Sequence, residues 1–108
     1  MNKMKLVILE SPFAGDIERN VEYARMCVKD SLMHGEAPIA SHLLYTQPGI
    51  LDDSVEEDRA LGIDAGLAWR EVAEGAVVYW DYGITEGMVT GVMAMWRRNK
   101  PVEYRKIL

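Results

Sequence analysis

The stretch GAVVYWDYGITEGMVTGVMAMWRRNKPVEYR, residues 75–105, carries the pattern that decides the fold. It opens with the apolar run GAVVYW, continues through a loop that contains glycine, and closes with the short segment PVEYR. Between these runs, Met88, Val92 and Met95 recur at the spacing of one face of a helix, whose start is marked by Thr85. A strand, a helix and a strand in this order predict two parallel strands in one sheet.

The residues before this unit repeat the alternation. KLVILES (5–11) is a short, continuously apolar run, which is typical of a strand buried on both faces of a sheet. A helix should follow, with Asp16 as its N-cap, Gly35 just past its end, and an apolar stripe made of Ile17, Val21, Ala24, Val28 and Leu32. APIAS (37–41) predicts a second strand, and HLLYTQPGILDD after it predicts a loop.

A second helix is predicted from Ser54, which forms a capping box with Glu57. Its apolar stripe consists of Leu61, Ala65, Ala68 and Val72. The complete order is therefore β-α-β-α-β-α-β. We expect a single α/β domain over residues 1–108, in which a small parallel sheet has helices on both faces.

Composition restricts the partners. The net charge of −5 and the pI near 5.0 argue against nucleic acid or an anionic membrane as the main partner. One cysteine, two histidines and no Cys-x-x-Cys pair argue against a structural metal site, and we expect no cofactor. A domain of 108 residues leaves apolar surface uncovered, so we expect a homo-oligomer.

The start of the chain, MNKMKLVILE, reaches charged residues too early for a signal peptide. The sequence also lacks the roughly 18 consecutive apolar residues of a membrane span. We therefore expect a cytoplasmic protein, or one in the host cytoplasm if a phage encodes it.

Three segments should meet where ligands bind in parallel sheets, beyond the carboxyl ends of the strands. Their glycines allow close backbone approach, their aromatic rings offer flat apolar surfaces, and the predicted helix after the third strand aims its N–H groups at a ligand. His42 could donate to a phosphate or a base, or be satisfied by loop backbone. The candidate binding residues are Ser11, Pro12, Phe13, Gly15, Asp16, His42, Tyr45, Asp81, Gly83, Thr85, Glu86, Gly87, Met88 and Gly91.

Four motifs in these regions carry a resemblance. They are Ser-Pro-Phe-x-Gly-Asp-x-Glu-x-Asn, Pro-Ile-Ala-x-His-Leu-Leu-Tyr, Leu-Gly-x-x-x-Gly-Leu-Ala-Trp and Gly-Ile-Thr-Glu-Gly-Met. From about Leu6 to Tyr104 the chain resembles the nucleoside 2-deoxyribosyltransferase-like superfamily, in particular its short phage and bacterial members. The resemblance implies a flavodoxin/Rossmann-like three-layer fold, homo-oligomers, and ligands built from a base, a sugar and sometimes a phosphate.

Enzymes of this superfamily cleave the N-glycosidic bond with a glutamate in a Gly-x-x-x-Glu pattern. Here the glycine of the pattern matches Gly87, and the glutamate position holds Gly91. A glycine cannot stabilise the oxocarbenium-like state through which such a bond breaks. Glycine within a helix costs about 1 kcal/mol relative to alanine, which suggests that the space at this position is useful.

We therefore expect a protein that binds a nucleoside- or nucleotide-derived small molecule without cleaving it, for example to sequester a nucleotide signal. The alternative is an active deoxyribosyltransferase or nucleotide N-glycosidase that uses Glu86, Asp81 or a residue of a neighbouring subunit. Glu86 also suits the start of a helix without any catalytic role. A subunit with a degenerate pocket is the third possibility.

Overall fold

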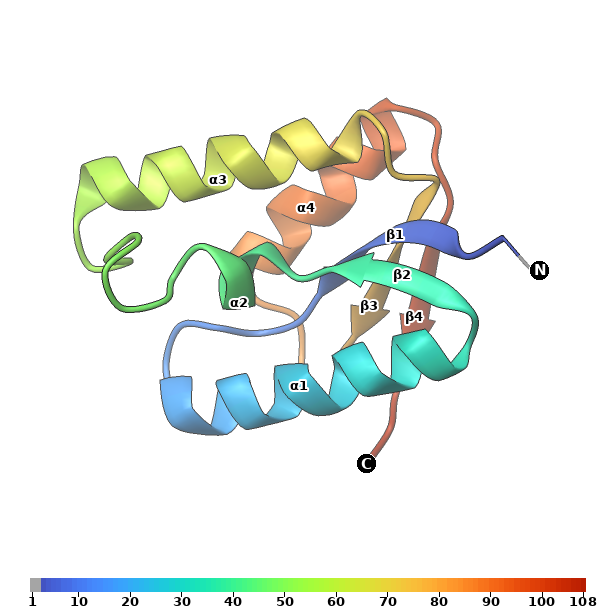
Figure 1. The fold of residues 1–108 in the computed structure, drawn as a ribbon, viewed down its shortest axis with the longest axis horizontal. Coiled ribbons are helices and arrows are strands. Elements are labelled where there is room, and N and C mark those ends of the chain that lie inside the picture. Colours follow the sequence, from blue (N-terminus) through green and yellow to red (C-terminus); the bar gives the residue numbers. More distant parts are fainter. Residues whose placement is uncertain (1–2) are drawn as a thin grey trace.

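In the computed structural model, which describes residues 3–108, four parallel strands form one sheet with helices on both faces (Figure 1). The strands are β1 (Lys5–Glu10), β2 (Glu36–Ile39), β3 (Gly75–Tyr79) and β4 (Val102–Arg105). The helices are α1 (Ile17–Met33), α2 (Ser41–Leu44), α3 (Glu56–Arg70) and α4 (Glu86–Arg97). The sheet order is β2-β1-β3-β4, so the predicted α/β fold with a small parallel sheet is confirmed.

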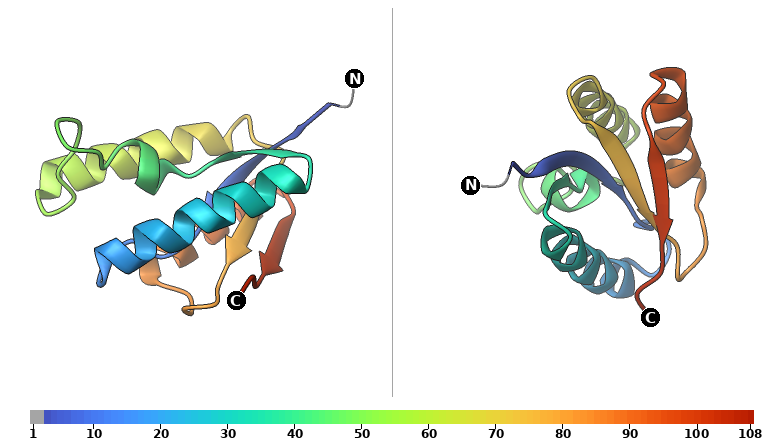
Figure 2. Two further views of the ribbon diagram at one scale, coloured as in Figure 1. Left: turned by 60° about the horizontal axis from the view of Figure 1, so that its bottom comes forward. Right: turned by 90° about the vertical axis from the view of Figure 1, so that its right-hand side faces the viewer.

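The sheet is the middle layer of three, as in flavodoxin- and Rossmann-like folds. Helix α1 lies on one face, and α3 and α4 lie on the other (Figure 2). Because successive side chains of a strand point to opposite faces, Val7 and Leu9 of β1 pack on the side of α1, whereas Ile8 packs against Met95 of α4. The continuously apolar run in β1 follows from this two-sided burial.

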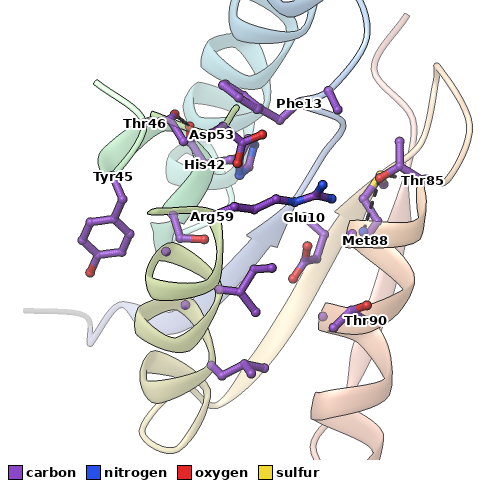
Figure 3. Close-up of a pocket in the computed structure, with 18 of the residues that line it drawn as sticks. Glu10, Phe13, His42, Tyr45, Thr46, Asp53, Arg59, Thr85, Met88 and Thr90 are labelled. Atoms are coloured by element: carbon purple, nitrogen blue, oxygen red, sulfur yellow. Dashed lines mark hydrogen bonds between the residues drawn. The ribbon is translucent and has the colours of Figure 1, made fainter. Parts of the chain in front are cut away.

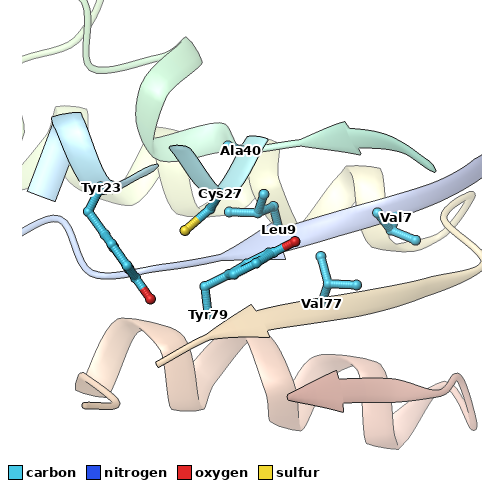
Figure 4. Close-up of a cluster of buried hydrophobic side chains, with 7 residues drawn as sticks. All are labelled: Val7, Leu9, Tyr23, Cys27, Ala40, Val77 and Tyr79. Atoms are coloured by element: carbon cyan, nitrogen blue, oxygen red, sulfur yellow. The ribbon is translucent and has the colours of Figure 1, made fainter. Parts of the chain in front are cut away.

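The larger core cluster lies between α1 and the sheet (Figure 4). Tyr23 and Cys27 come from α1, and they meet Leu9, Val77 and Tyr79 of the two central strands. The Cys27 side chain is 0 % exposed, and burial raises the pKa of its thiol to about 12. On the opposite face, Met88, Val92 and Met95 of α4 are buried, as their spacing predicts.

Several predicted helix ends are confirmed. Asp16 caps α1 by accepting a hydrogen bond from the Arg19 backbone N–H at 3.2 Å. Gly35 follows the end of α1 with a φ of 79°, a conformation that favours glycine. Thr85 caps α4 by accepting from the Met88 N–H at 3.3 Å.

The capping box predicted at Ser54 and Glu57 is wrong. Helix α3 begins at Glu56 after Val55, which makes no side-chain cap. The Ser54 hydroxyl and its backbone N–H both bond instead to the Asp52 carboxylate, at 2.6 and 2.9 Å. These local hydrogen bonds to Asp52 occupy the Ser54 side chain, which therefore does not cap the helix.

Two further predictions differ from the structure. The segment after β2 begins with the short helix α2 rather than an irregular loop. The apolar stripe predicted for α3 faces outward: Leu61 of α3 is 58 % exposed, and Val72, just past the end of α3, is 62 % exposed. The buried residues of α3 are Gly66 and Arg70, so this helix turns a glycine and an arginine toward the interior.

An apolar groove of about 270 Å³ follows the β2 edge of the sheet beside α3. Leu6, Ile39, Trp69 and Val72 are among its lining residues. Within residues 3–108, no helix is both long enough and apolar enough to cross a membrane.

The strand order of the sheet reverses between the neighbouring strands β1 and β3: from β1 the chain continues to β2 on one side, and from β3 it continues to β4 on the other side. The chain leaves β1 toward α1 on one face, and it leaves β3 toward α4 on the other (Figure 1). Open parallel sheets bind ligands at such a point, beyond the carboxyl ends of the strands.

Candidate functional site

A cavity of about 490 Å³ opens at this point, between the end of β1, α2, α3 and the start of α4 (Figure 3). Its volume lies in the range of sites that hold small molecules. Nine of the fourteen candidate residues line it: Ser11, Phe13, His42, Tyr45, Thr85, Glu86, Gly87, Met88 and Gly91.

Four candidates that do not line the cavity have structural roles or positions nearby. Asp16 is the N-cap of α1, and Gly15 and Gly83 have φ angles of 99° and 86°, which the turns after the strands require. Pro12 is buried beside the cavity without lining it.

Asp81, the fifth, is also excluded as a catalytic group of this cavity. Its carboxylate accepts a hydrogen bond from the Tyr23 hydroxyl at 2.6 Å and from the backbone N–H groups of Ile107 and Leu108 at 2.9–3.1 Å. Partial burial acts to raise the pKa of Asp81, but these hydrogen bonds outweigh it and hold the pKa below its usual value. Asp81 therefore anchors the end of the chain to the sheet.

The sequence interpretation missed the ion pair at the floor of the cavity, which joins Glu10 of β1 to Arg70 of α3. Glu10 is 7 % exposed and Arg70 is 6 % exposed. Arg70 donates from Nη2 to the Glu10 carboxylate, from Nη1 to the Gly66 carbonyl at 2.6 Å, and from Nε to the Gly91 carbonyl at 3.3 Å. The guanidinium thus links β1, α3 and α4.

Gly91 is the reason that this pair fits between the helices. A Cβ atom at position 91 would overlap the Glu10 carboxylate and would lie 2.5 Å from Arg70 Nη2. The space beside Gly91 is therefore filled by protein groups, and the idea that it is left open for a ligand is wrong. A carboxylate does lie next to position 91, but it comes from β1.

Only one oxygen of the Glu10 carboxylate is used by the protein. Oε2 accepts from Arg70, while Oε1 has no hydrogen-bond partner among residues 3–108 and is not sealed from the cavity. Burial raises the pKa of the Glu10 carboxyl to about 7, and the charge and hydrogen bond of Arg70 oppose the rise. Glu10 can consequently exchange a proton near neutral pH.

Beside Glu10, the Ser11 hydroxyl and the His42 Nε2 atom lie 2.6 Å apart. Burial and, to a smaller extent, the positive charge of Arg70 lower the pKa of His42 to about 4, so the ring is neutral at neutral pH. The Phe13 ring meets the His42 ring edge-on, with centroids 6.4 Å apart. This corner of the cavity combines a neutral donor–acceptor pair with an aromatic surface.

Charged side chains surround the mouth of the cavity. Arg59 extends from α3 across it, and Asp53, Asp58 and Glu86 also contribute to its lining (Figure 3). The Arg59 guanidinium makes no hydrogen bond or ion pair with another side chain of residues 3–108. Tyr45 lines the mouth as well, and its hydroxyl accepts from Trp69 Nε1 at 2.7 Å. The mouth can therefore meet a polar or charged part of a ligand.

The geometry defines an α/β protein with a cavity at the strand-order switch and a buried carboxylate, paired with an arginine, at the cavity floor. The family profile described as "Domain of unknown function (DUF7768)" matches residues 5–105, and the chain belongs to this family. A search of curated proteins gave no match.

Proposed function

We propose that the cavity binds a nucleoside- or nucleotide-like small molecule. The observation that supports this best is the combination, in one cavity of about 490 Å³, of the Phe13 ring with unsatisfied polar groups at the floor and mouth. A base has a flat face that stacks on an aromatic ring, and its sugar carries hydroxyl groups that bond to a carboxylate oxygen such as Glu10 Oε1.

The start of α4 completes the proposed site. Thr85, Glu86 and Gly87 line the cavity, so the N-terminal end of this helix lies at it, and Arg59 brings a positive charge to the same cavity. Both features favour a ligand with an anionic group, such as a phosphate, without requiring one. The resemblance to nucleoside 2-deoxyribosyltransferase-like proteins agrees with a ligand of this class.

The expectation that the ligand is held without cleavage depended on the missing carboxylate at position 91. That reason is weakened, because the Glu10 carboxylate lies beside Gly91. Of the alternative catalytic residues, Glu86 remains at the cavity and Asp81 does not. The proposed function is therefore the binding itself, and sequestration of a nucleotide signal is one use of such binding.

The test is direct. Isothermal titration calorimetry with ribo- and deoxynucleosides and their 5′-monophosphates should give saturable binding of one ligand per chain for at least one compound. Mass spectrometry of small molecules released by denaturing freshly purified protein should identify a ligand of the same class. Free ribose and glucose serve as controls that lack a base. The proposal fails if no member of the panel binds and no nucleoside-like molecule is released.

A further inference from the structure

Two glutamates are buried in the described part of the chain, and their carboxylates differ in how many oxygens the protein uses. Glu36 uses both, because Oε1 accepts from Ser31 and Arg105 and Oε2 accepts from Arg105. Glu10 uses only Oε2, which accepts from Arg70, and its Oε1 has no hydrogen-bond partner among the groups that the structure describes. The Glu10 side chain is 9 % exposed and lines the cavity, so Oε1 is an unpaired acceptor at the cavity floor (Figure 3).

Arg70 decides which oxygen of Glu10 stays free. Its guanidinium has only donors, and the carbonyls of Gly66 and Gly91 hold it in place while Nη2 donates to Glu10 Oε2. Oε2 is therefore kept toward Arg70, and Oε1 is left to the cavity. The positive charge of Arg70 also balances the carboxylate, so a ligand does not need a positive charge to approach this floor.

An acceptor in this position favours one kind of ligand group. A hydroxyl or an amino group can donate to Oε1, and a hydrogen bond to an ionised carboxylate is about twice as strong as one between neutral groups. A carbonyl or phosphate oxygen would instead face Oε1 as acceptor against acceptor. Both groups would then be left unpaired at a buried site, which costs free energy.

We propose that Glu10 Oε1 determines the ligand specificity of the cavity by accepting a hydrogen bond from an uncharged donor, either a sugar hydroxyl or an amino group of the base. The inference rests on the proposed function, because it takes the ligand to be nucleoside-like. It also gives the ligand an orientation. The uncharged donor lies at the floor, and any anionic group lies nearer Arg59, which crosses the mouth (Figure 3).

The contact should respond to pH. Arg70 already donates to Oε2, so a proton added to Glu10 sits on Oε1 and turns this acceptor into a donor. Burial raises the pKa of Glu10 to about 7, against the charge and hydrogen bond of Arg70. Burial and the charge of Arg70 lower the pKa of His42 to about 4, so its ring stays neutral near pH 7. The other titratable or charged groups that line the cavity are Asp58 and Arg59 of α3, Glu86 of α4, Tyr45 just after α2 and Asp53 in the loop before α3.

The first test measures affinities by calorimetry for matched pairs of nucleosides that differ in one donor. One arm removes a sugar hydroxyl, with the 2′-, 3′- and 5′-deoxy forms compared with the ribonucleosides. The other arm removes an amino group, with purine riboside compared with adenosine and inosine compared with guanosine. If only nucleotides bind, the same pairs are used as 5′-monophosphates. In wild type, loss of the donor that meets Glu10 should weaken binding at least about tenfold.

In Glu10→Gln this preference should disappear or reverse. The amide oxygen must take the place of Oε2, because Arg70 donates to it, so the amide NH₂ points into the cavity and presents donors. The ligand without the donor should then bind at least as tightly as its partner. Glu22→Gln, on the exposed face of α1, is the matched control and should keep the wild-type preference. A folded Glu10→Gln variant with the wild-type preference would overturn the proposal.

The wild type alone gives a second test, which does not depend on a variant folding. Only the ionised carboxylate offers Oε1 as an acceptor, so the preferred nucleoside should bind about tenfold more weakly at about pH 6 than at about pH 8. Adenosine and guanosine do not titrate in this interval, so the change belongs to the protein. An affinity that stays constant or increases as the pH falls would contradict the role of Glu10.

The two proposals fail separately. If wild type binds nucleosides or nucleotides and no matched pair differs, the role of Glu10 is wrong and the proposed binding function stands. If no compound binds, the proposed function is wrong, and this inference fails with it. A difference in the hydroxyl arm that Glu10→Gln removes places the sugar at the floor. The same result in the amino arm places the base there, and either result supports the proposal.

Discussion

The space beside Gly91 is shared by three elements, and a single methyl group there would disturb all of them. A Cβ at this position would overlap the Glu10 carboxylate and lie 2.5 Å from Arg70 Nη2. Neither group can retreat easily, because Arg70 is held by the carbonyls of Gly66 and Gly91. The glycine thus has a packing role that overrides its low helix propensity.

We therefore predict that Gly91→Ala lowers the free energy of unfolding by about 1–3 kcal/mol, the usual cost of overpacking a core, in spite of the gain in helix propensity. Gly62→Ala on α3 is the control, since its Cβ would meet only Leu51 Cδ1 at 3.4 Å. That variant should be as stable as wild type or more stable by up to about 1 kcal/mol. Urea unfolding measures both, and a Gly91→Ala variant as stable as Gly62→Ala would contradict the role of Gly91.

The pKa shifts of Glu10 and His42 make the free energy of unfolding depend on pH in opposite directions. Glu10 has its pKa raised from 4.5 to about 7, so its contribution to stability is complete below pH 4.5 and is lost as the pH rises through 7. His42 has its pKa lowered from 6.5 to about 4, so its contribution is complete above pH 6.5 and is lost as the pH falls through 4. Between pH 4.5 and 6.5 the two effects oppose each other.

A variant without the Glu10 carboxyl should show the effect of His42 protonation on stability alone. In Glu10→Gln, the free energy of unfolding should fall more steeply than in wild type as the pH is lowered from 6.5 to 4.5. The difference in slope is at most about 1.4 kcal/mol per pH unit, the value for one proton. Urea unfolding at several pH values measures the slopes, and Glu22→Gln should follow wild type. Equal slopes for wild type and Glu10→Gln would mean that Glu10 does not titrate in this range.

Among the elements, α4 depends on its first turn to meet a ligand. Gly87 lies in that turn and lines the cavity, and a Cβ there would meet only Thr85 Oγ1 at 3.9 Å. A larger side chain is therefore compatible with the fold but would narrow the cavity.

We predict that Gly87→Val weakens binding of the nucleoside-like ligand at least about tenfold, because each 1.4 kcal/mol of lost contact is a factor of ten. Met93→Val places the same side chain on the exposed part of α4, outside the cavity, and is the matched control. Calorimetry with one ligand compares the two variants. Equal affinities would show that the start of α4 does not contact the ligand.

The elements also explain which features could be predicted from the sequence. Strands and helices were predicted well because each depends on local spacing, as in KLVILES or in the stripe of Met88, Val92 and Met95. The inward face of α3 was not, because it contains Gly66 and Arg70, which give no hydropathic signal. Most of the predicted binding residues do line the cavity, because they follow the carboxyl ends of the strands, and parallel strands end at one edge of the sheet.

The Glu10–Arg70 pair was missed because its members lie 60 positions apart and contact each other only in the folded chain. One signal was present: Glu10 is a charged residue at the end of a run that is otherwise apolar. A charge that ends a buried strand must find a partner or a ligand, and this rule would have pointed to Glu10.

At the scale of the whole molecule, large apolar residues remain exposed on several elements. One such surface is formed by Val72, which is more than half exposed, and by the groove along the β2 edge, which Val72 also lines. We predict that the protein is a homo-oligomer through this surface, and that Val72→Asp shifts it toward monomer. Val89→Asp, which changes an exposed residue of α4 outside this surface, is the control. Analytical ultracentrifugation at micromolar concentration gives the result, and a monomeric wild type would contradict the prediction.

Because Cys27 is buried between α1 and the sheet, its reactivity reports the separation of this helix from the strands. Cys27 is the chain's one cysteine, and it lies fully buried between α1 and the sheet. A thiol reagent can reach it only when α1 separates from the strands, because the native packing leaves no path to the sulfur. The rate of labelling in the absence of denaturant therefore counts such separations, and a ligand that tightens the cavity on the other face of the sheet would slow the labelling only if the two layers open together.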